Sequence, residues 1–136
     1  MPILISVYTE RALDLGDLAT RYSDIADIYF YGLYLGVQNN DWLSFRIDAS
    51  DEGDAVLEED YTQRVMRVRA LVGRPVQALI ESSNYESIDL ALSRIPAAGV
   101  FVENEYEVIF SLAEIQRRLQ SGEDWVSVGR EFLLKP

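Results

Sequence analysis

Seven carboxylates between positions 48 and 60 form the densest cluster of side chains in the sequence that could do chemistry. No basic residue separates them, and they are Asp48, Asp51, Glu52, Asp54, Glu58, Glu59 and Asp60. A negative patch of this density can steer a positively charged partner and raise its association rate. Acidic residues in the first turn of a helix also stabilise the helix dipole, so the run is typical of a solvated helix start as well.

The same run partly imitates a calcium-binding loop. Six residues can be placed on the ligand and turn positions of an EF-hand, namely Asp48, Ser50, Glu52, Gly53, Asp54 and Glu59. The match is incomplete, because Glu52 is atypical at its position and Ala55 is a weak hydrophobic. The preceding segment also alternates like a strand, where an EF-hand needs a helix. We therefore predict no metal site and no cofactor.

Aromatic residues gather upstream of this run, and they are Tyr29, Tyr31, Tyr34 and Trp42. In one strand over 28–35, Tyr29 and Tyr31 would share a face and Tyr34 would lie opposite. Exposing the apolar and aromatic side chains of both faces to water would be energetically unfavourable. Either the strand is central and buried on both faces, or one tyrosine-rich face is an interface anchored by aromatic rings.

A smaller acidic row consists of Glu103, Glu105 and Glu107, which alternate with apolar residues. Under the two-residue period of a strand, the three glutamates point the same way. Charged side chains along a sheet edge prevent pairing with other chains, so the row predicts a solvated, protected edge.

Several catalytic chemistries are excluded by composition. The chain has no histidine and no cysteine, which removes Ser-His-Asp and Cys-His arrangements and zinc sites built from these ligands. Lys135 is the single lysine, and no glycine-rich phosphate loop occurs. The sequence therefore favours a binding protein over an enzyme. A carboxylate-dependent enzyme, or a protein that binds a small ligand or a metal, is the alternative, and it requires several acids to converge with Arg46 or an aromatic in one pocket.

The overall charge limits the choice of partner. With 23 acidic and 12 basic side chains, the 136-residue chain carries a formal net charge of −11. This charge repels phosphate backbones and anionic membrane surfaces, so nucleic acid and membrane are poor partners. No stretch approaches the roughly 18 to 20 apolar residues of a membrane span. The apolar start lacks the basic flank of a secretion signal, and a cytoplasmic location is the default expectation.

Periodicity and capping signals predict the elements that position these residues. Strands are expected over 3–8, 28–35, 43–47 and 76–81, with two more between 99 and 110 around Glu103-Asn104-Glu105. Helices are expected over 17–25, 54–72, 83–95 and 111–122, the last two opened by capping boxes at Ser83 and Ser111. A hairpin through 36–41 should join the second and third strands, and 125–134 fits a helix or a strand.

This inventory predicts a single α+β domain over residues 1–136. The sheet is mixed or antiparallel with about five to six strands, and three to four helices form a single layer on one face. Its length suits one hydrophobic core.

The leading hypothesis is a non-catalytic, acidic protein-binding module, such as a small inhibitor or adaptor. The acidic run over 48–60 would steer a basic partner, and the aromatic hairpin would anchor it. Immunity proteins and antitoxins that neutralise basic toxins have the same general composition, being small, acidic and free of catalytic motifs. A homodimer that buries the aromatic face is a further possibility.

Overall fold

The computed structural model describes residues 2–11, 13–32, 34–39, 43–49 and 76–130. Four predicted features lie outside the described residues: the helix over 54–72, the acidic residues from Asp51 to Asp60, Trp42, and the chain from 131 onward. The imitation of a calcium loop falls almost entirely in the same part of the chain.

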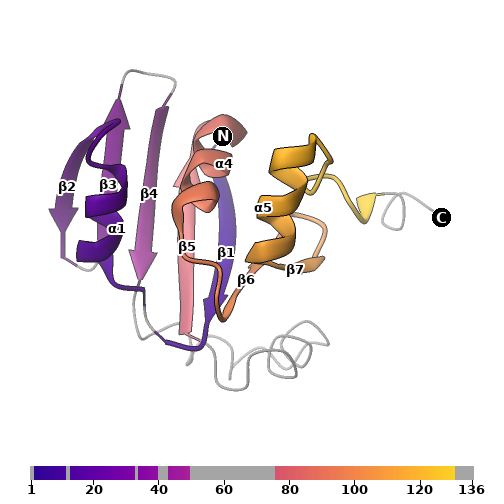
Figure 1. The fold of residues 1–136 in the computed structure, drawn as a ribbon. Helices are drawn as coiled ribbons and strands as arrows, with labels where there is room; N and C mark the ends of the chain where they lie inside the picture. Colours follow the sequence, from indigo (N-terminus) through magenta and orange to yellow (C-terminus); the bar gives the residue numbers. More distant parts are fainter. Residues whose placement is uncertain (1, 12, 33, 40–42, 50–75, 131–136) are drawn as a thin grey trace.

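Seven antiparallel strands form one sheet in the described part of the chain, in the order β2-β3-β4-β5-β1-β6-β7 (Figure 1). The strands are β1 (Ile3–Thr9), β2 (Asp27–Tyr31), β3 (Tyr34–Asn39), β4 (Leu43–Ala49), β5 (Val76–Ser82), β6 (Val100–Glu103) and β7 (Ile109–Ser111). The described helices are α1 (Leu15–Tyr22), α4 (Tyr85–Arg94) and α5 (Leu112–Ser121). The predicted α+β class is confirmed, with more strands than expected.

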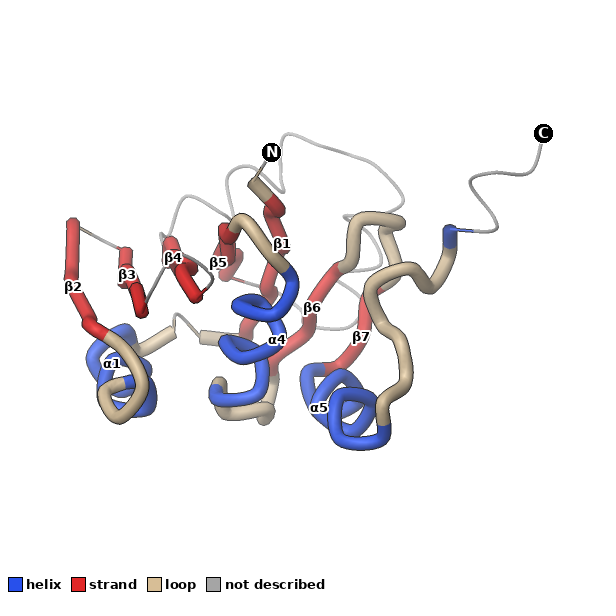
Figure 2. Tube along the Cα trace, turned by 90° about the horizontal axis from the view of Figure 1, so that it is seen from above, coloured by secondary structure: helices blue, strands red, loops and turns tan. Residues whose placement is uncertain are grey.

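The three described helices cover one face of the sheet, which Figure 2 shows from above. The core lies between these two layers, and its fully buried residues include Val7, Ile47 and Ile80 from strands and Leu18, Ile88 and Leu112 from helices. Strand β5 shows how the pattern arises, because Ala78, Ile80 and Ser82 are buried while the residues that alternate with them, Leu79 and Glu81, are only partly buried. Alternation along the strands therefore divides the sheet into a helix-covered face and an opposite face.

The aromatic run over 28–35 forms two strands instead of the one that was predicted. Gly32 has a φ of 59°, a left-handed conformation that glycine adopts without steric cost, and the chain turns there. Tyr31 is consequently opposite Tyr34 in the β2–β3 pair. The predicted hairpin to the next strand is present as β3–β4, but β3 continues to Asn39, so its connection is shorter than the predicted 36–41 loop.

Helix starts follow their caps, with small shifts from the predicted positions. Ser111 caps α5 by accepting a hydrogen bond from the Glu114 amide at 3.2 Å, as predicted. The cap of α4 is Asn84 and not Ser83, because the Asn84 side chain accepts from the Ser87 amide at 2.8 Å. Asp14 caps α1 in the same way, so this helix begins before the predicted residue 17.

The predicted strand row of three solvated glutamates is wrong at Glu103, which is buried at the end of β6. Glu105 and Glu107 are exposed as predicted, but they lie in the turn that follows and not along a strand. The Asn104 side chain produces this turn, because its Oδ1 accepts hydrogen bonds from the amides of Tyr106 and Val108 at 2.9 and 3.0 Å. The strand alternation thus stops where the row begins.

Residues 125–129, which follow α5, form neither the helix nor the strand that was predicted for this segment. Trp125 nevertheless enters the core, with 1% of its surface exposed. The Asn104 amide nitrogen donates to the carbonyls of Trp125 and Val128, both at 2.9 Å. One buried side chain therefore satisfies backbone groups that regular structure would otherwise pair.

Candidate functional site

Strand β2 is an edge of the described sheet (Figure 1). It exposes three consecutive aromatic side chains. The exposed fractions are 46% for Tyr29, 56% for Phe30 and 72% for Tyr31. The prediction that these tyrosines lie on a central strand buried on both faces is therefore wrong. Exposed aromatic rings in a contiguous group are typical of a contact surface.

The aromatic residues of β2 divide between the two faces of the sheet. Phe30 is opposite the fully buried Leu35, so it lies on the helix-covered face, beyond the part that the helices enclose. Tyr29 and Tyr31 lie on the opposite face with Tyr34, whose ring centroid is 5.3 Å from that of Tyr31. The edge thus presents apolar surface in both directions.

Arg46 links the tyrosines of the edge to the middle of the sheet. Its guanidinium carbon lies 5.1 Å from the centroid of the Tyr34 ring, a cation–π contact. It also forms an ion pair with Glu81 on the adjacent strand. The register places one row across five strands on this face, consisting of Tyr29, Gly36, Arg46, Glu81 and Leu4.

A hollow of about 300 Å³ lies beside this row. Its lining residues are Pro2, Tyr29, Ser44, Phe45, Arg46, Glu81, Ser82 and Ser83. Arg46 and an aromatic do meet here, as the enzyme alternative requires, but Glu81 is the single carboxylate among the described lining residues and is already paired with Arg46. The described part of the hollow therefore does not bring together the several acids that this alternative needs.

A second pocket of about 380 Å³ lies at the start of α1 and contains Glu10, Asp14 and Asp17. Asp14 is occupied by capping the helix, and Asp17 pairs with Arg21 at 2.9 Å. Within the described ranges no group of three or more acidic side chains is arranged to hold a metal ion. Asp14 and Asp17 therefore have structural roles in the helix start.

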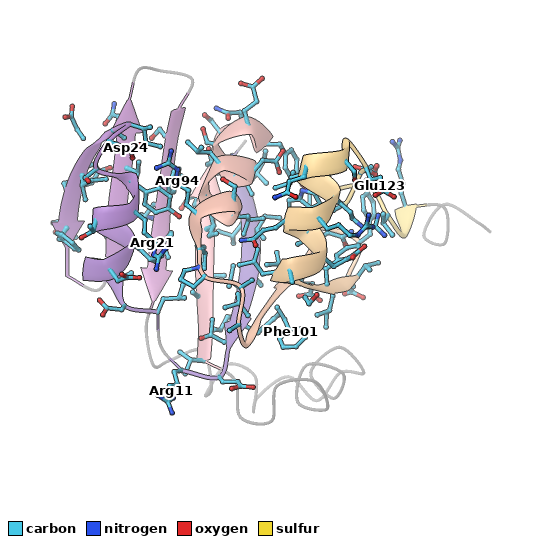
Figure 3. The ribbon with its side chains drawn as sticks, viewed as in Figure 1. Arg11, Arg21, Asp24, Arg94, Phe101 and Glu123 are labelled. Carbon is cyan, nitrogen blue, oxygen red and sulfur yellow. The ribbon has the colours of Figure 1, made fainter. Side chains whose placement is uncertain are left out.

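The loop that leads into β2 is anchored to the helix layer. The Arg94 guanidinium, at the end of α4, donates to the Asp24 carboxylate and to the Arg21 carbonyl, both at 2.6 Å (Figure 3). Hydrogen bonding to Arg94 holds the pKa of the Asp24 carboxyl below its usual range. This contact fixes the chain where it leaves α1 and enters the exposed edge strand.

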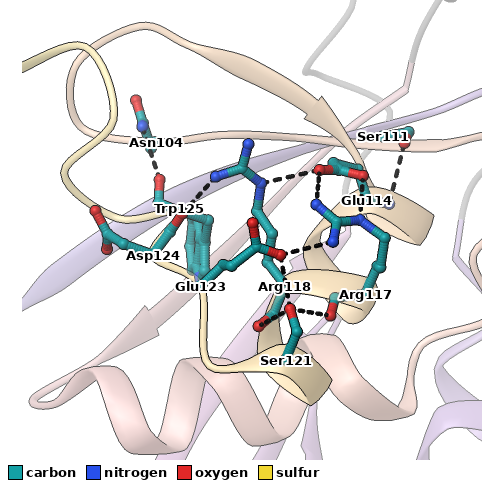
Figure 4. Close-up of polar contacts among 9 residues, drawn as sticks. All are labelled: Asn104, Ser111, Glu114, Arg117, Arg118, Ser121, Glu123, Asp124 and Trp125. Atoms are coloured by element: carbon teal, nitrogen blue, oxygen red, sulfur yellow. Dashed lines mark hydrogen bonds and ion pairs between the residues drawn. The ribbon is translucent and has the colours of Figure 1, made fainter.

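Acidic residues at the other end of the sheet support the fold. Glu114 pairs with Arg117 at 2.7 Å and Arg118 at 3.0 Å, and Arg117 also reaches Glu123 at 2.6 Å (Figure 4). Hydrogen bonds from the two arginines lower the pKa of Glu114 to about 2. The network holds the chain after α5 against the helix and so directs Trp125 into the core.

Two further hydrogen bonds join side chains that are buried or half-buried in the fold. The Tyr8 hydroxyl donates to Glu103 Oε1 at 2.8 Å, and both residues are buried. Asp89 is half-buried and accepts a hydrogen bond from the Trp125 indole at 3.0 Å. Burial raises the pKa of Asp89, the indole hydrogen bond opposes this, and Asp124 adds a smaller increase.

The structure brings together three of the residues predicted to bind a partner, Tyr29, Tyr31 and Tyr34. Asp48 lies in β4 as the Cα partner of Tyr34, so the acidic run begins next to the tyrosines. The other predicted residues lie outside the described ranges, and they are Trp42, Asp51, Glu52, Asp54, Glu58, Glu59 and Asp60. Sequence reasoning did not select Phe30, whose exposure follows from the edge position of β2.

No family model, curated protein or solved structure matches this chain. None of the described helices is long and apolar enough to cross a membrane. The geometry of the edge surface and the charge of the chain are therefore the features that indicate a function.

Proposed function

We propose that this protein is a non-catalytic protein-binding module that recognises a basic partner, in the manner of a small inhibitor or immunity-type protein. The proposal is carried by one observation: an edge strand with three exposed aromatic side chains in succession, Tyr29, Phe30 and Tyr31. Tyrosine and phenylalanine supply large contact areas with few rotatable bonds, so they bind a partner at low entropic cost.

The charge of the chain favours a basic partner. A net charge of −11 attracts a positively charged protein over long distances and repels an acidic one. The acidic run starts at Asp48, which pairs through its backbone with Tyr34 at the aromatic surface. We propose that the run steers the partner toward the edge, where the aromatic rings hold it. In this mechanism the charges raise the rate of association, and the aromatic rings slow dissociation.

Affinity capture from the native host tests this function. The tagged full chain is incubated with lysate at low salt, and bound protein is eluted with rising salt. The test variant combines Tyr29→Ser, Phe30→Ser and Tyr31→Ser. The control variant combines Ser93→Ala, Ala113→Ser and Gln120→Ala, three exposed positions on α4 and α5.

The wild type and the control are expected to retain the same basic protein, which elutes as salt screens the attraction. The triple serine variant is expected to lose it, provided that circular dichroism shows an unchanged fold. Equal retention by the triple serine variant would contradict the proposed function. An acidic protein as the main species retained would contradict the role of charge.

A further inference from the structure

We propose that the partner is recognised through its main chain, as an extended basic segment that pairs with the free edge of β2. This inference rests on the proposed function and specifies how the same surface binds. It is carried by three features of the edge: the direction of its backbone groups, its lack of protection, and its surroundings.

The outward backbone groups of strand β2 have no hydrogen-bond partner among the described residues. Tyr31 and Tyr34 flank a two-residue turn, and such residues form the hydrogen-bonded pair that closes a hairpin. Hydrogen-bonded and non-hydrogen-bonded pairs alternate along an antiparallel ladder. Ile28 and Phe30 therefore belong to non-hydrogen-bonded pairs, and their amides and carbonyls point away from β3. No described strand pairs with this outer side.

The residues of strand β2 themselves provide little of the usual protection against pairing. Its five residues contain no proline and no lysine, and the continuous register with β3 leaves no room for a bulge. Asp27 supplies the single charge, at the start of the strand. The opposite edge, β7, has only three residues and so offers a shorter template. Exposed apolar edge strands are templates for strand addition, so β2 is the edge suited to it.

The chemistry of the added segment follows from its neighbours. On the face of Tyr29 and Tyr31, a lysine or arginine side chain would lie over a tyrosine ring, a favourable cation–π contact. On the other face, an apolar side chain would pack beside the exposed ring of Phe30. The segment that fits therefore alternates basic and apolar residues.

A second copy of the chain is a poorer occupant of this edge. Two molecules that each carry −11 repel one another. A basic segment is instead attracted by the same negative charge that keeps two copies apart.

The direct test is an amide NMR titration of the full chain, labelled with nitrogen-15. The probe is the capped peptide Arg-Val-Arg-Val-Arg-Val-Arg, and the matched control is Glu-Val-Glu-Val-Glu-Val-Glu. With the basic peptide, the largest shifts are expected at the amides of Ile28 and Phe30. At a peptide concentration about ten times its dissociation constant, their hydrogen exchange should slow about tenfold. The acidic peptide should leave both amides unchanged.

Two variants separate backbone pairing from side-chain contact. Phe30→Pro removes an amide that points outward, so the ladder to β3 remains, and proline is tolerated on an edge strand. Phe30→Ala removes the same ring but keeps the amide. The proline variant is expected to lose peptide binding, whereas the alanine variant should bind only a few fold more weakly than wild type.

The proposal is overturned by equal binding of the two variants, by shifts confined to other amides, or by equal binding of the acidic peptide. Shifts at Ile28 and Phe30 that grow with protein concentration alone would assign the edge to a second copy and also overturn it. Lysate capture distinguishes a failure of strand addition from a failure of the proposed binding function. Capture that fails with the triple serine variant but survives Phe30→Pro as well as Phe30→Ala leaves the binding function intact and rejects strand addition.

Discussion

The ring of Tyr29 occupies the space above Gly36 into which any other residue would project its side chain. A Cβ atom on Gly36 would lie 2.1 Å from Tyr29 Cζ and 2.6 Å from its hydroxyl oxygen. The two residues are cross-strand partners in the β2–β3 pair. An aromatic ring over a strand glycine restores packing that the glycine lacks, and here it also orients one of the exposed rings of the edge.

Gly36→Ala should therefore displace the Tyr29 ring. We expect a loss of about 1 kcal/mol in the free energy of unfolding, because overpacking forces the ring out of its position. In a Tyr29→Ala background the same substitution should cost less, since no ring is displaced. Urea unfolding of the four proteins in this double-mutant cycle measures the coupling. Strict additivity would contradict the contact between ring and glycine.

Asn104→Ala should destabilise the fold more than any surface substitution. The side chain is 5% exposed and satisfies two amides and two carbonyls, those of Tyr106, Val108, Trp125 and Val128. Leaving such groups buried without partners should cost about 3 kcal/mol. Chemical denaturation monitored by tryptophan fluorescence measures this. Gln120→Ala, at an exposed position of α5, is the control and should change stability by less than about 0.5 kcal/mol.

Local signals in the sequence predicted the parts of the fold that depend on neighbouring residues. The start of α5 at Ser111 and its end at Gly122 follow from a capping serine and a left-handed glycine. The turn at Gly32 was missed because it lies inside an aromatic run that reads as one strand. Whether that run is central or at an edge depends on the order of all seven strands, which no local spacing encodes.

Other features could not be predicted from the sequence because they depend on contacts between residues far apart in the chain. The alternation of glutamates predicted a solvated row, yet Glu103 meets a tyrosine 95 residues away in the chain. The exposure of Phe30 and the pairing of Arg46 with Glu81 likewise need the register of β2–β3 and β4–β5. The tyrosines could be selected as contact residues from their types, but not placed on an edge.

Asp89→Asn should become relatively more stabilising as the pH rises. Burial raises the pKa of Asp89 in the folded state above its unfolded value near 3.8. Its stabilising contribution is therefore complete below that unfolded value and is lost as the pH rises through the folded pKa. Asparagine keeps an oxygen for the Trp125 indole and carries no charge. The free energy of unfolding of the variant minus that of wild type should be larger at about pH 7 than at about pH 3. A difference that decreases with rising pH would contradict this.

Glu114→Gln should show the opposite dependence. The folded pKa of Glu114 is lowered to about 2 by hydrogen bonds from Arg117 and Arg118, so its contribution is present above the unfolded value near 4.5. It is lost as the pH falls through about 2. The variant should be less stable than wild type at neutral pH and equal to it in strong acid. Glu86→Gln, at the first turn of α4, is the matched control. A difference between wild type and Glu114→Gln that persists in strong acid would count against the network.

Site-specific photocrosslinking in native host cells tests most directly whether the aromatic edge of β2 contacts a basic protein. Phe30→p-benzoylphenylalanine places the reactive ring on the edge, and Ala113→p-benzoylphenylalanine places it on the exposed side of α5. After irradiation, position 30 is expected to yield one dominant adduct with a basic protein that position 113 does not yield. The same adducts at both positions, or none at position 30, would contradict a partner-binding role for this edge.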